Sequence, residues 1–400
     1  MKHLIIDEIG PLKHVDIELG KVNVIIGPQS SGKSCVLKIA SYCTWVEKRI
    51  ELAQSAEAFS NDRQFLMRLV KYHKLQQYVR PNTRIEYESD FMHFAYSNED
   101  ESFKFEWKEG RWDYVRNKVA YIPAERNMVA AIPNWFDIKL DENNIRGFMS
   151  DWETSRKVTT NDLQVLNLDA RYRYDTKTGK DVITVDGGLE LDFTNTSSGL
   201  QSLIPLFVYL NYLSYTQYKQ ELNSVTTQNE NAKLLEIIYN DLFVNTGKTR
   251  SRQMPSQLDY EGKKTLSADV TIAPIGPYIL RFYDSKAADE CKAIYEKYTQ
   301  VFSCDVFLEE PEENLFPPTQ MLLTDWLIEL SKKDNPSRLF IATHSPYVLN
   351  SFVESTDVAY NLFTTKVIDG YAEVKKATEE DIQGILDYGV DAFLNSDTLG

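Results

Sequence analysis

The first fifty residues change from an alternating pattern of apolar and polar positions to a helical one. Apolar side chains alternate with polar ones up to residue 19, with turn signals at Gly10-Pro11 and at Gly20, and a mostly apolar run follows at 22–26. This pattern predicts a hairpin that leads into a buried strand. From Cys35 past Arg49 the apolar positions recur at helical spacing. The chain therefore predicts a strand, a glycine-containing loop and a helix, in that order.

The remaining pattern predicts an α/β fold with a mixed or parallel core sheet. Short β-prone runs between about 84 and 122, with a turn signal at Glu109-Gly110, predict an inserted antiparallel β lobe. The polar stretch 223–270, with one helical island at 234–243, predicts an insertion that is mobile or carries specificity. Other predicted elements are a helix over 139–168, three short strands over 171–193, a helix from Ser198, a helix over 286–301, a strand over 304–308, a helix near 318–332, a strand over 339–342 and an acidic β/α tail.

Composition places the 400-residue chain among ordinary globular proteins and excludes several classes. Hydrophobic residues make up 42% and charged residues 26%, which excludes disorder, collagen and coiled-coil rods as descriptions of the whole chain. No stretch approaches about 18 uninterrupted apolar residues, so we expect no membrane span and a cytoplasmic protein. The net charge of −15 argues against a uniformly basic nucleic-acid-coating surface but leaves a local basic groove possible. Four scattered cysteines without CxxC spacing (Cys35, Cys43, Cys291 and Cys304) predict reduced core thiols.

The octet 27–34 matches the phosphate-binding pattern G-x-x-x-x-G-K-[ST] between a predicted strand and a predicted helix. Its glycines allow successive backbone N–H groups and the helix N-terminus to face phosphates, Lys33 reaches the β/γ oxygens, and Ser34 is a ligand for Mg²⁺. The alternative is a glycine turn that caps an ordinary helix. The predicted ATP-binding residues are Gly27, Pro28, Gln29, Ser30, Ser31, Gly32, Lys33, Ser34 and Cys35.

A second predicted strand, 304–308, ends in two carboxylates at Glu309 and Glu310, before Pro311. In a parallel sheet this end faces the nucleotide, and consecutive strand residues point to opposite faces. We therefore assign Glu309 to Mg²⁺, through water, and Glu310 to the attacking water as the catalytic base. An acidic turn before the proline is the alternative. The strand 339–342 ends near His344, which we assign to the γ-phosphate or the attacking water.

Together these motifs resemble the ABC-type ATPases of the SMC, RecF and OLD class. Residues 309–317 (EEPEENLFP) fit the family's EEPE...L.P pattern, and residues 343–346 (THSP) fit its histidine motif. The resemblance implies a P-loop ABC-type ATPase head with an antiparallel β lobe and helical insertions, ATP and Mg²⁺ as cofactors, and ATP hydrolysis. It covers 1–365 as the ATPase domain, with insertions at about 127–170 and 223–285, and leaves 366–400 as a short C-terminal tail.

Three further segments fit the same resemblance. Residues 196–202 (TSSGLQS) are similar to the family's signature loop, which binds the ATP of a partner subunit, although Leu200 departs from the commonest version; the implied contacts are Ser197, Ser198, Gly199 and Gln201. A plain helix N-cap is the alternative. Residues 121–126 (YIPAER) look like the family's Y-I-P-x-E-R segment near the Q-loop. The standard glutamine is absent, so Glu125 or Arg126 takes that role, unless the two only form a loop salt bridge. Asn314 falls at the D-loop, which crosses the dimer interface in the family.

The resemblance also implies a biological role. Compact heads of this kind resemble the AAA-type, OLD-like ATPase subunits of bacterial antiphage defence systems such as PARIS, Septu and retron-linked operons. It implies an ATP-dependent head-to-head dimer that controls a separate effector, such as a nuclease subunit, with a phage-derived trigger as a further partner. The alternatives are a RecF- or SMC-like DNA repair ATPase and a transporter nucleotide-binding subunit. The large insertions and the EEPEENLFP segment argue against the transporter.

Overall fold

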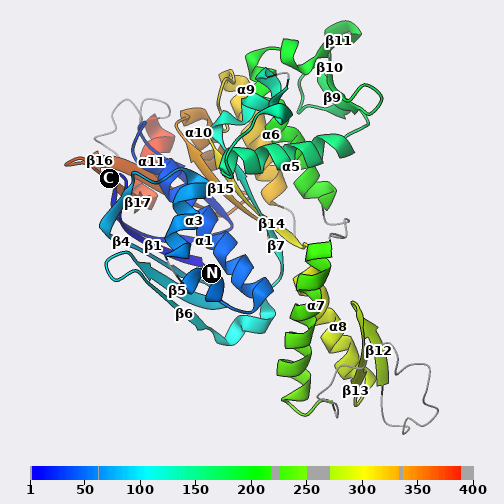
Figure 1. Cartoon of the computed structure of the whole chain (residues 1–400). Helices are drawn as coiled ribbons and strands as arrows, with labels where there is room; N and C mark the ends of the chain where they lie inside the picture. Colours follow the sequence, from blue (N-terminus) through cyan, green and yellow to red (C-terminus); the bar gives the residue numbers. More distant parts are fainter. Residues whose placement is uncertain are drawn as a thin grey trace.

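The protein is built around one 11-stranded sheet (Figure 1). The structure, a computed structural model, describes residues 2–61, 63–132, 134–217, 225–249, 271–332 and 337–388. The strand order in the sheet is β6-β5-β4-β1-β2-β17-β16-β3-β15-β14-β7. Its strands are β1 (Lys2–Ile9), β2 (Leu12–Leu19), β3 (Val22–Ile26), β4 (Val79–Glu88), β5 (Met92–Ser97), β6 (Ser102–Trp107), β7 (Asn117–Ile122), β14 (Ser303–Glu309), β15 (Arg338–Thr343), β16 (Tyr360–Ile368) and β17 (Tyr371–Lys376).

The sheet has a parallel half and an antiparallel half, as the sequence predicts. Strands β16, β3, β15, β14 and β7 run parallel to one another, whereas β2, β1, β4, β5 and β6 are joined by antiparallel pairing. One detail of the prediction is wrong. Residues 119–122 belong to β7, which pairs in parallel with β14 in the core and is not part of the antiparallel lobe. A short β-prone run has the same pattern in either kind of pairing, so periodicity could not separate the two.

Alternate residues of the parallel strands face two different hydrophobic cores. Val22, Val24 and Ile26 of β3 face the core formed with α6, α9 and α10, whereas Ile25 faces the core that contains α1. This double burial explains why β3 is buried along its whole length. The helices of the two layers are α1 (Lys33–Ala53), α2 (Glu57–Ser60) and α3 (Gln64–His73) on one side, and α6 (Ser198–Tyr215), α9 (Pro317–Ser331) and α10 (Pro346–Glu354) on the other.

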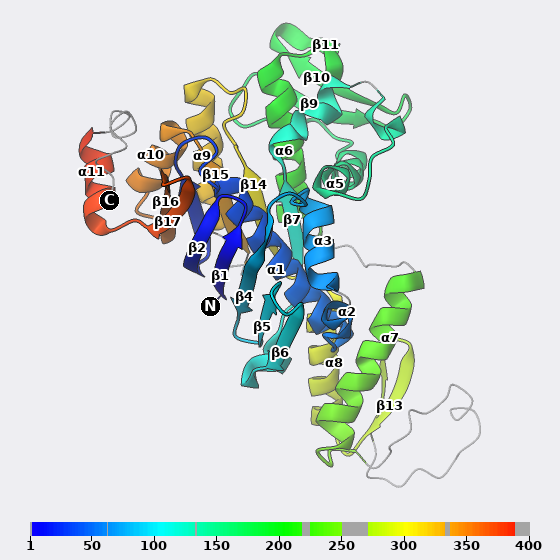
Figure 2. The ribbon, with the colours of Figure 1, turned by 60° about the vertical axis from the view of Figure 1, so that its left-hand side comes forward.

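Two smaller units extend from the sheet in different directions (Figure 2). The first contains a four-stranded antiparallel sheet, and the second packs two helices against a two-stranded hairpin around a separate hydrophobic core. The first unit comprises the short helix α4 (Met128–Ala131), helix α5 (Asn144–Val158) and strands β8 (Leu163–Gln164), β9 (Ala170–Asp175), β10 (Lys180–Val185) and β11 (Leu189–Asp192). The second comprises α7 (Val225–Tyr239), the π-helical turn η7 (Asn240–Val244), β12 (Thr271–Ile275), β13 (Tyr278–Phe282) and α8 (Ser285–Thr299).

Two predicted segments differ in extent from the elements observed. The helix predicted over 139–168 is confined to α5, because the polar and β-branched stretch after Val158 ends it and β8 follows. Of the predicted insertion 223–270, the structure describes 225–249, which contain α7 and η7. Residues 250–270 lie outside the described residues.

The C-terminal strands belong to the main sheet. The domain boundary expected at residue 365 falls inside β16, and β17 pairs with both β16 and β2. Helix α11 (Glu379–Tyr388) then packs against α10. All four cysteines are buried and free, as predicted. Within the described residues, no helix is both long and apolar enough to span a membrane.

Candidate functional site

The predicted phosphate-loop and catalytic residues meet at one edge of the parallel half-sheet. Strands β3, β14, β15 and β7 are parallel, so the segments that follow their carboxyl ends lie beside one another. These segments are the 27–34 loop, the Glu309-Glu310 pair, the turn at His344 and the segment 123–126. In the register of the sheet, Glu309 lies opposite Ala342, and Thr343 lies opposite Ile26.

Two glycines allow the 27–34 loop to approach its neighbours closely. Gly27 has a φ of 156°, and a Cβ atom there would lie 2.5 Å from the carbonyl oxygen of Thr365 on β16. Gly32 has a φ of 86° and occupies the N-cap position of α1, where a Cβ would lie 2.7 Å from the Leu12 side chain. A larger residue at either position would displace backbone or core atoms. Ser31 is buried beneath the loop and hydrogen-bonds to Thr365.

Lys33 folds back over the loop that precedes it. Its ammonium group donates to the carbonyl oxygens of Gly27 at 2.9 Å and Pro28 at 2.6 Å, and lies 3.4 Å from the hydroxyl of Ser31. Burial lowers the pKa of Lys33 from 10.5 to about 8, although the negative charges of Glu310 and Glu312 oppose the shift. The lysine is therefore held close to the backbone that a phosphate group would contact.

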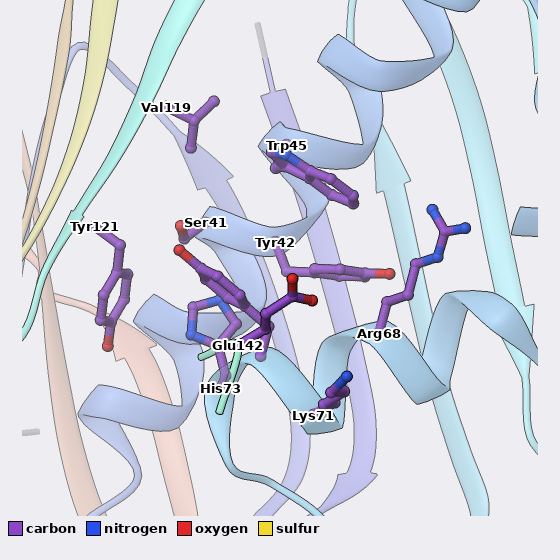
Figure 3. Close-up of a pocket in the computed structure, with 10 residues that line it drawn as sticks. Ser41, Tyr42, Trp45, Arg68, Lys71, His73, Val119, Tyr121 and Glu142 are labelled. Atoms are coloured by element: carbon purple, nitrogen blue, oxygen red, sulfur yellow. The ribbon is translucent and has the colours of Figure 1, made fainter. Parts of the chain in front are cut away.

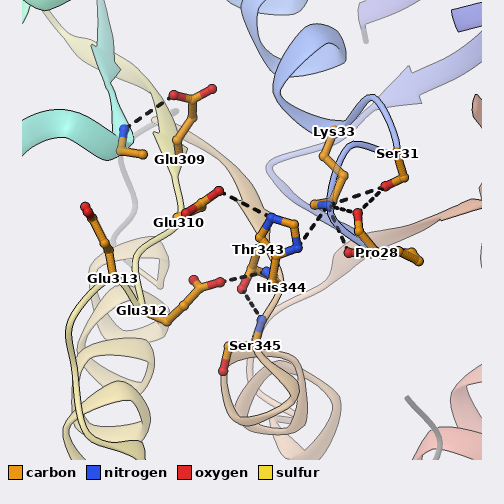
Figure 4. Close-up of polar contacts among 12 residues, drawn as sticks. Pro28, Ser31, Lys33, Glu309, Glu310, Glu312, Glu313, Thr343, His344 and Ser345 are labelled. Carbon is orange, nitrogen blue, oxygen red and sulfur yellow. Dashed lines mark hydrogen bonds and ion pairs between the residues drawn. The ribbon is translucent and has the colours of Figure 1, made fainter. Parts of the chain in front are cut away.

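His344 connects Lys33 to the acidic end of β14 (Figure 4). Nδ1 of His344 lies 3.2 Å from the Lys33 ammonium, and Nε2 lies 3.3 Å from Oε1 of Glu310. Since an ammonium group can only donate, Nδ1 accepts and the ring proton is carried by Nε2. The backbone N–H of His344 donates to Oε1 of Glu312 at 2.6 Å, which fixes the turn after β15.

Glu310 adopts a strained backbone conformation with its carboxylate directed toward His344. Its φ is 41°, which side-chain-bearing residues rarely adopt, and its N–H donates to the carbonyl of Ala342 at 2.8 Å. The hydrogen bond from His344 lowers the pKa of Glu310, partial burial opposes that shift, and the positive charge of Lys33 reinforces it. The carboxylate is therefore ionised at neutral pH and can accept a proton.

Glu309 faces a different set of partners from Glu310, as expected for consecutive strand residues. It is 4% exposed; one oxygen accepts from the N–H of Ala124 at 3.4 Å and the other, Oε1, lies 3.8 Å from the ammonium of Lys38. Oε1 is buried and has no hydrogen-bond partner among the described residues. Lys38 is one helical turn beyond Ser34 on α1, and both line the pocket over the loop. A buried carboxylate oxygen without a hydrogen bond, whose ion-pair partner Lys38 lines the pocket together with Ser34, fits a hydrated Mg²⁺, which favours oxygen ligands.

Arg126 has a different position from the γ-phosphate-sensing one predicted for it. Its guanidinium is fully buried and donates to the carbonyl oxygens of Glu309 at 2.9 Å, Glu310 at 2.8 Å and Ser202 at 3.2 Å. It therefore fixes the strained end of β14 and ties that end to the first turns of α6. Its closest carboxylate oxygen, in Glu313, is 3.9 Å away, so the salt bridge considered as the alternative is long. Glu125 is exposed on the neighbouring 3₁₀ turn, η2 (Ala124–Asn127).

The predicted signature segment lies at the surface beside the predicted D-loop. Ser197 is the N-cap of α6, and its hydroxyl accepts from the N–H of Leu200 at 3.4 Å, so the helix-cap alternative accounts for that residue. Ser198 is exposed at the first position of the helix. Gly199 lies against the carbonyl of Asn314, and the Asn314 amide donates to the hydroxyl of Ser202 at 2.9 Å.

The signature segment is not joined to the phosphate loop within the chain. The side-chain amide of Gln201 donates to the carbonyl oxygens of Thr194 and Thr196, in its own loop. Among the described residues, no hydrogen bond connects 197–201 to 27–34.

A pocket of about 560 Å³ lies over the phosphate loop, large enough for a nucleotide. Sequence reasoning found the residues on its phosphate side. It missed Lys38, which the spacing i+4 from Ser34 on the same helix could have indicated. It also missed the far wall, where the turn at Gly10-Pro11 meets Tyr78 and Arg80, because only the fold brings these segments to the loop.

Comparisons with known proteins give distant structural likenesses only. No protein-family model and no curated protein matches the chain. Among solved structures, it is similar to an Smc head bound to the C-terminal winged-helix domain of ScpA, at 10% identity and a TM-score of 0.44, covering 96% of this chain and 99% of that one. It is also similar to an Smc head with an extended coiled coil bound to the C-terminal domain of ScpA derived from Pyrococcus furiosus, at 11% identity and a TM-score of 0.32, covering 97% and 99%. A structure of the recombination mediator RecF has 12% identity and a TM-score of 0.29, covering 93% and 97%. Because these TM-scores are low, the fold is defined by the strand order and pairing of this chain alone.

Proposed function

We propose that this chain is an ATPase of the ABC type that binds ATP over the 27–34 loop and hydrolyses it with Glu310 as the base. The observation that carries the proposal is the contact series from Lys33 through His344 to Glu310, which joins a cation, a proton-bearing ring and an ionised carboxylate at the ends of three parallel strands. Phosphoryl transfer requires a cation on the β/γ oxygens and a group that orients and deprotonates water. The three residues supply both.

Each residue has a separate task in this proposal. Lys33 exchanges its carbonyl contacts for the β/γ oxygens, and the backbone N–H groups of the loop and the N-terminus of α1 bind the remaining phosphate oxygens. Glu310 accepts the proton of the attacking water, while Nε2–H of His344 orients the carboxylate or donates to the γ-phosphate. Ser34 and, through water, Glu309 would hold Mg²⁺, which neutralises charge that develops on the phosphate oxygens.

We further propose that two copies form the complete site. Among the described residues, the exposed Ser198 and the neighbouring Asn314 make no hydrogen bond to the chain's own phosphate loop, and an exposed helix N-terminus is suited to binding the γ-phosphate of a partner's ATP. ATP would then hold two heads together, and hydrolysis would release them.

The biological role that we propose is a switch in a bacterial antiphage defence complex, in which the ATP-dependent dimer controls a separate effector subunit. It rests on the resemblance of the motifs to such ATPase subunits. Affinity purification of the tagged chain from its own host, with and without phage infection, tests it by identifying the bound proteins. Recovery of DNA repair proteins and tight, salt-sensitive binding to duplex DNA would favour the RecF-like alternative.

The ATPase proposal is tested by phosphate release from the purified full-length chain. Wild-type protein should release phosphate from ATP and Mg²⁺, Lys33→Ala should lose ATP binding, and Glu310→Gln should bind ATP without hydrolysing it. Lys104→Ala and Glu354→Gln are matched controls at exposed positions and should behave as wild type. Unchanged ATP affinity in Lys33→Ala would contradict the assignment of the phosphate loop.

A further inference from the structure

A second cavity lies between α1, α3 and β7 (Figure 3). Its volume is about 380 Å³, within the range of small-molecule sites. It shares no lining residue with the pocket over the phosphate loop. The residues that line it are Ser41, Tyr42, Trp45, Arg68, Lys71, Tyr72, His73, Val119, Tyr121 and Glu142.

One wall of this cavity is aromatic. Tyr42 and Trp45 are three residues apart on the same face of α1. Their rings are stacked, with centroids 5.7 Å apart and an interplanar angle of 28°. Tyr42 is buried, whereas Trp45 is half-buried and closer to solvent. Such a wall favours a planar ligand, because ring faces stack on heterocycles with a gain of roughly 1–3 kcal/mol per base.

The interior holds a polar group without a partner. His73 is only 1% exposed. Its Nδ1 atom is buried and makes no hydrogen bond among the described residues. Burial, reinforced by the positive charge of Lys38, lowers the pKa of His73 well below 6.5, so the ring is neutral and can donate or accept. Buried polar atoms are nearly always paired in native proteins. A ligand with a heteroatom at this depth would satisfy the imidazole.

The rim of the cavity carries two cations from one helix face. Arg68 and Lys71 are three residues apart on α3 and both are exposed. Neither has an ion-pair partner among the described residues, and the guanidinium of Arg68 lies 5.3 Å from the centroid of the Phe59 ring. Glu142, also exposed, lies at the same cavity and can accept hydrogen bonds from sugar hydroxyls or an exocyclic amine. The lining therefore combines a stacking wall, an interior hydrogen-bonding group and an anion-binding rim.

We propose that this cavity binds a free mononucleotide, with the base against Tyr42 and Trp45 and the phosphate between Arg68 and Lys71. The site has no lining residue in common with the pocket over the phosphate loop, but Tyr121 links it to Glu309. Tyr121 lines the cavity, packs edge-to-face on His73 with ring centroids 4.9 Å apart, and lies close enough to Glu309 for that carboxylate's charge to raise its pKa further, after burial. An occupant would therefore touch residues packed directly against the proposed magnesium ligand.

The test is a calorimetric titration of AMP into the full-length Lys33→Ala protein, in which the proposed ATP site lacks its phosphate-binding lysine. We expect saturable binding with a Kd below about 1 mM, and binding at least about tenfold weaker for adenosine or for inorganic phosphate alone. Arg68→Glu/Lys71→Glu, added to the same background, should weaken AMP binding at least about tenfold, since both side chains are exposed and act through charge. Lys104→Glu/Lys292→Glu reverses two exposed lysines elsewhere, which have no ion pair within the described part of the chain, and should leave the affinity unchanged.

A second variant tests the interior of the cavity. Val119→Trp fills space from the edge strand β7 without changing charge, and circular dichroism with a melting curve verifies its fold. It should also abolish AMP binding. The proposal is overturned by the absence of saturable AMP binding to Lys33→Ala, or by equal AMP affinity in the parent and in the Arg68→Glu/Lys71→Glu variant. Because no readout uses ATP hydrolysis, this result stands or fails independently of the proposed ATPase.

Discussion

The ammonium group of Lys33 donates a hydrogen bond to Nδ1 of His344 across 3.2 Å. The phosphate loop and the turn after β15 are therefore joined by side chains, and the ring proton of His344 is directed at Glu310, 3.3 Å away. A γ-phosphate that draws Lys33 toward its oxygens would release Nδ1 of His344. We expect that nucleotide binding and the orientation of the catalytic carboxylate are coupled through this ring.

The pH dependence of ATP affinity should report the charge of Lys33. Its pKa is lowered to about 8, so the folded protein loses this proton as the pH rises through 8, and the cation needed for the β/γ oxygens disappears. We expect the Kd for ATP to rise roughly 10- to 30-fold between pH 7 and 9.5, because only the protonated fraction binds. Lys33→Arg keeps its charge throughout this range and serves as the control. Parallel pH profiles for the two proteins, measured by equilibrium binding, would exclude Lys33 as the titrating group.

The two carboxylates at the end of β14 should differ in the step that they affect. Glu310→Gln keeps the shape of the side chain but loses the base, so hydrolysis should fall by about 10²- to 10⁴-fold while ATP affinity is retained. Glu309→Gln should instead raise the Mg²⁺ concentration required for half-maximal activity. Steady-state kinetics over a range of Mg²⁺ concentrations separates these effects. The assignment of the pair is reversed if Glu310→Gln hydrolyses normally and Glu309→Gln does not.

Arg126 should be needed for the position of the catalytic segment and for stability. Replacing it with methionine leaves the carbonyls of Glu309 and Glu310 buried without their donor, at a cost of about 1–3 kcal/mol for each unsatisfied group. We expect Arg126→Met to lower the free energy of unfolding in urea by at least about 2 kcal/mol and to reduce kcat more than ATP affinity. Arg146→Met removes an exposed guanidinium that donates to one carbonyl, and is the matched control. Equal stability and kcat in the two variants would mean that Arg126 positions nothing.

The sequence predicted strands β3, β14 and β15 and the groups that follow them because each was local. The 27–34 octet, the Glu309-Glu310 pair and the 343–346 turn each follow a strongly apolar run, and parallel pairing then brings them together. The position of Arg126 could not be predicted, since its partners are backbone carbonyls on β14 and α6 that carry no sequence signal. The assignment of 119–122 to the antiparallel lobe was wrong for a related reason: strand direction depends on partners far away in the chain.

Complementation between two inactive variants should reveal a site shared by two chains. Lys33→Ala disables a chain's own phosphate loop, and Ser198→Arg blocks the exposed helix start that we assign to its partner's site. Each protein alone should be inactive, whereas a mixed dimer retains one site with both parts intact. Mixing under conditions that allow subunit exchange should restore part of the wild-type ATPase activity, if one site can act without the other. Full activity of Ser198→Arg alone would return Ser198 to the role of an ordinary residue at a helix start.

The most direct test of the central claim is the molar mass of Glu310→Gln, measured by light scattering after gel filtration with ATP and Mg²⁺. This variant should bind ATP without consuming it, so ATP should double its mass relative to the nucleotide-free protein, and ADP should not. A second substitution in the same chain, Ser198→Arg, should prevent this increase in mass while ATP still binds. Two results would contradict an ATP site shared between two heads. One is a molar mass of Glu310→Gln that does not change although ATP is bound. The other is a Glu310→Gln/Ser198→Arg protein that associates as readily as Glu310→Gln.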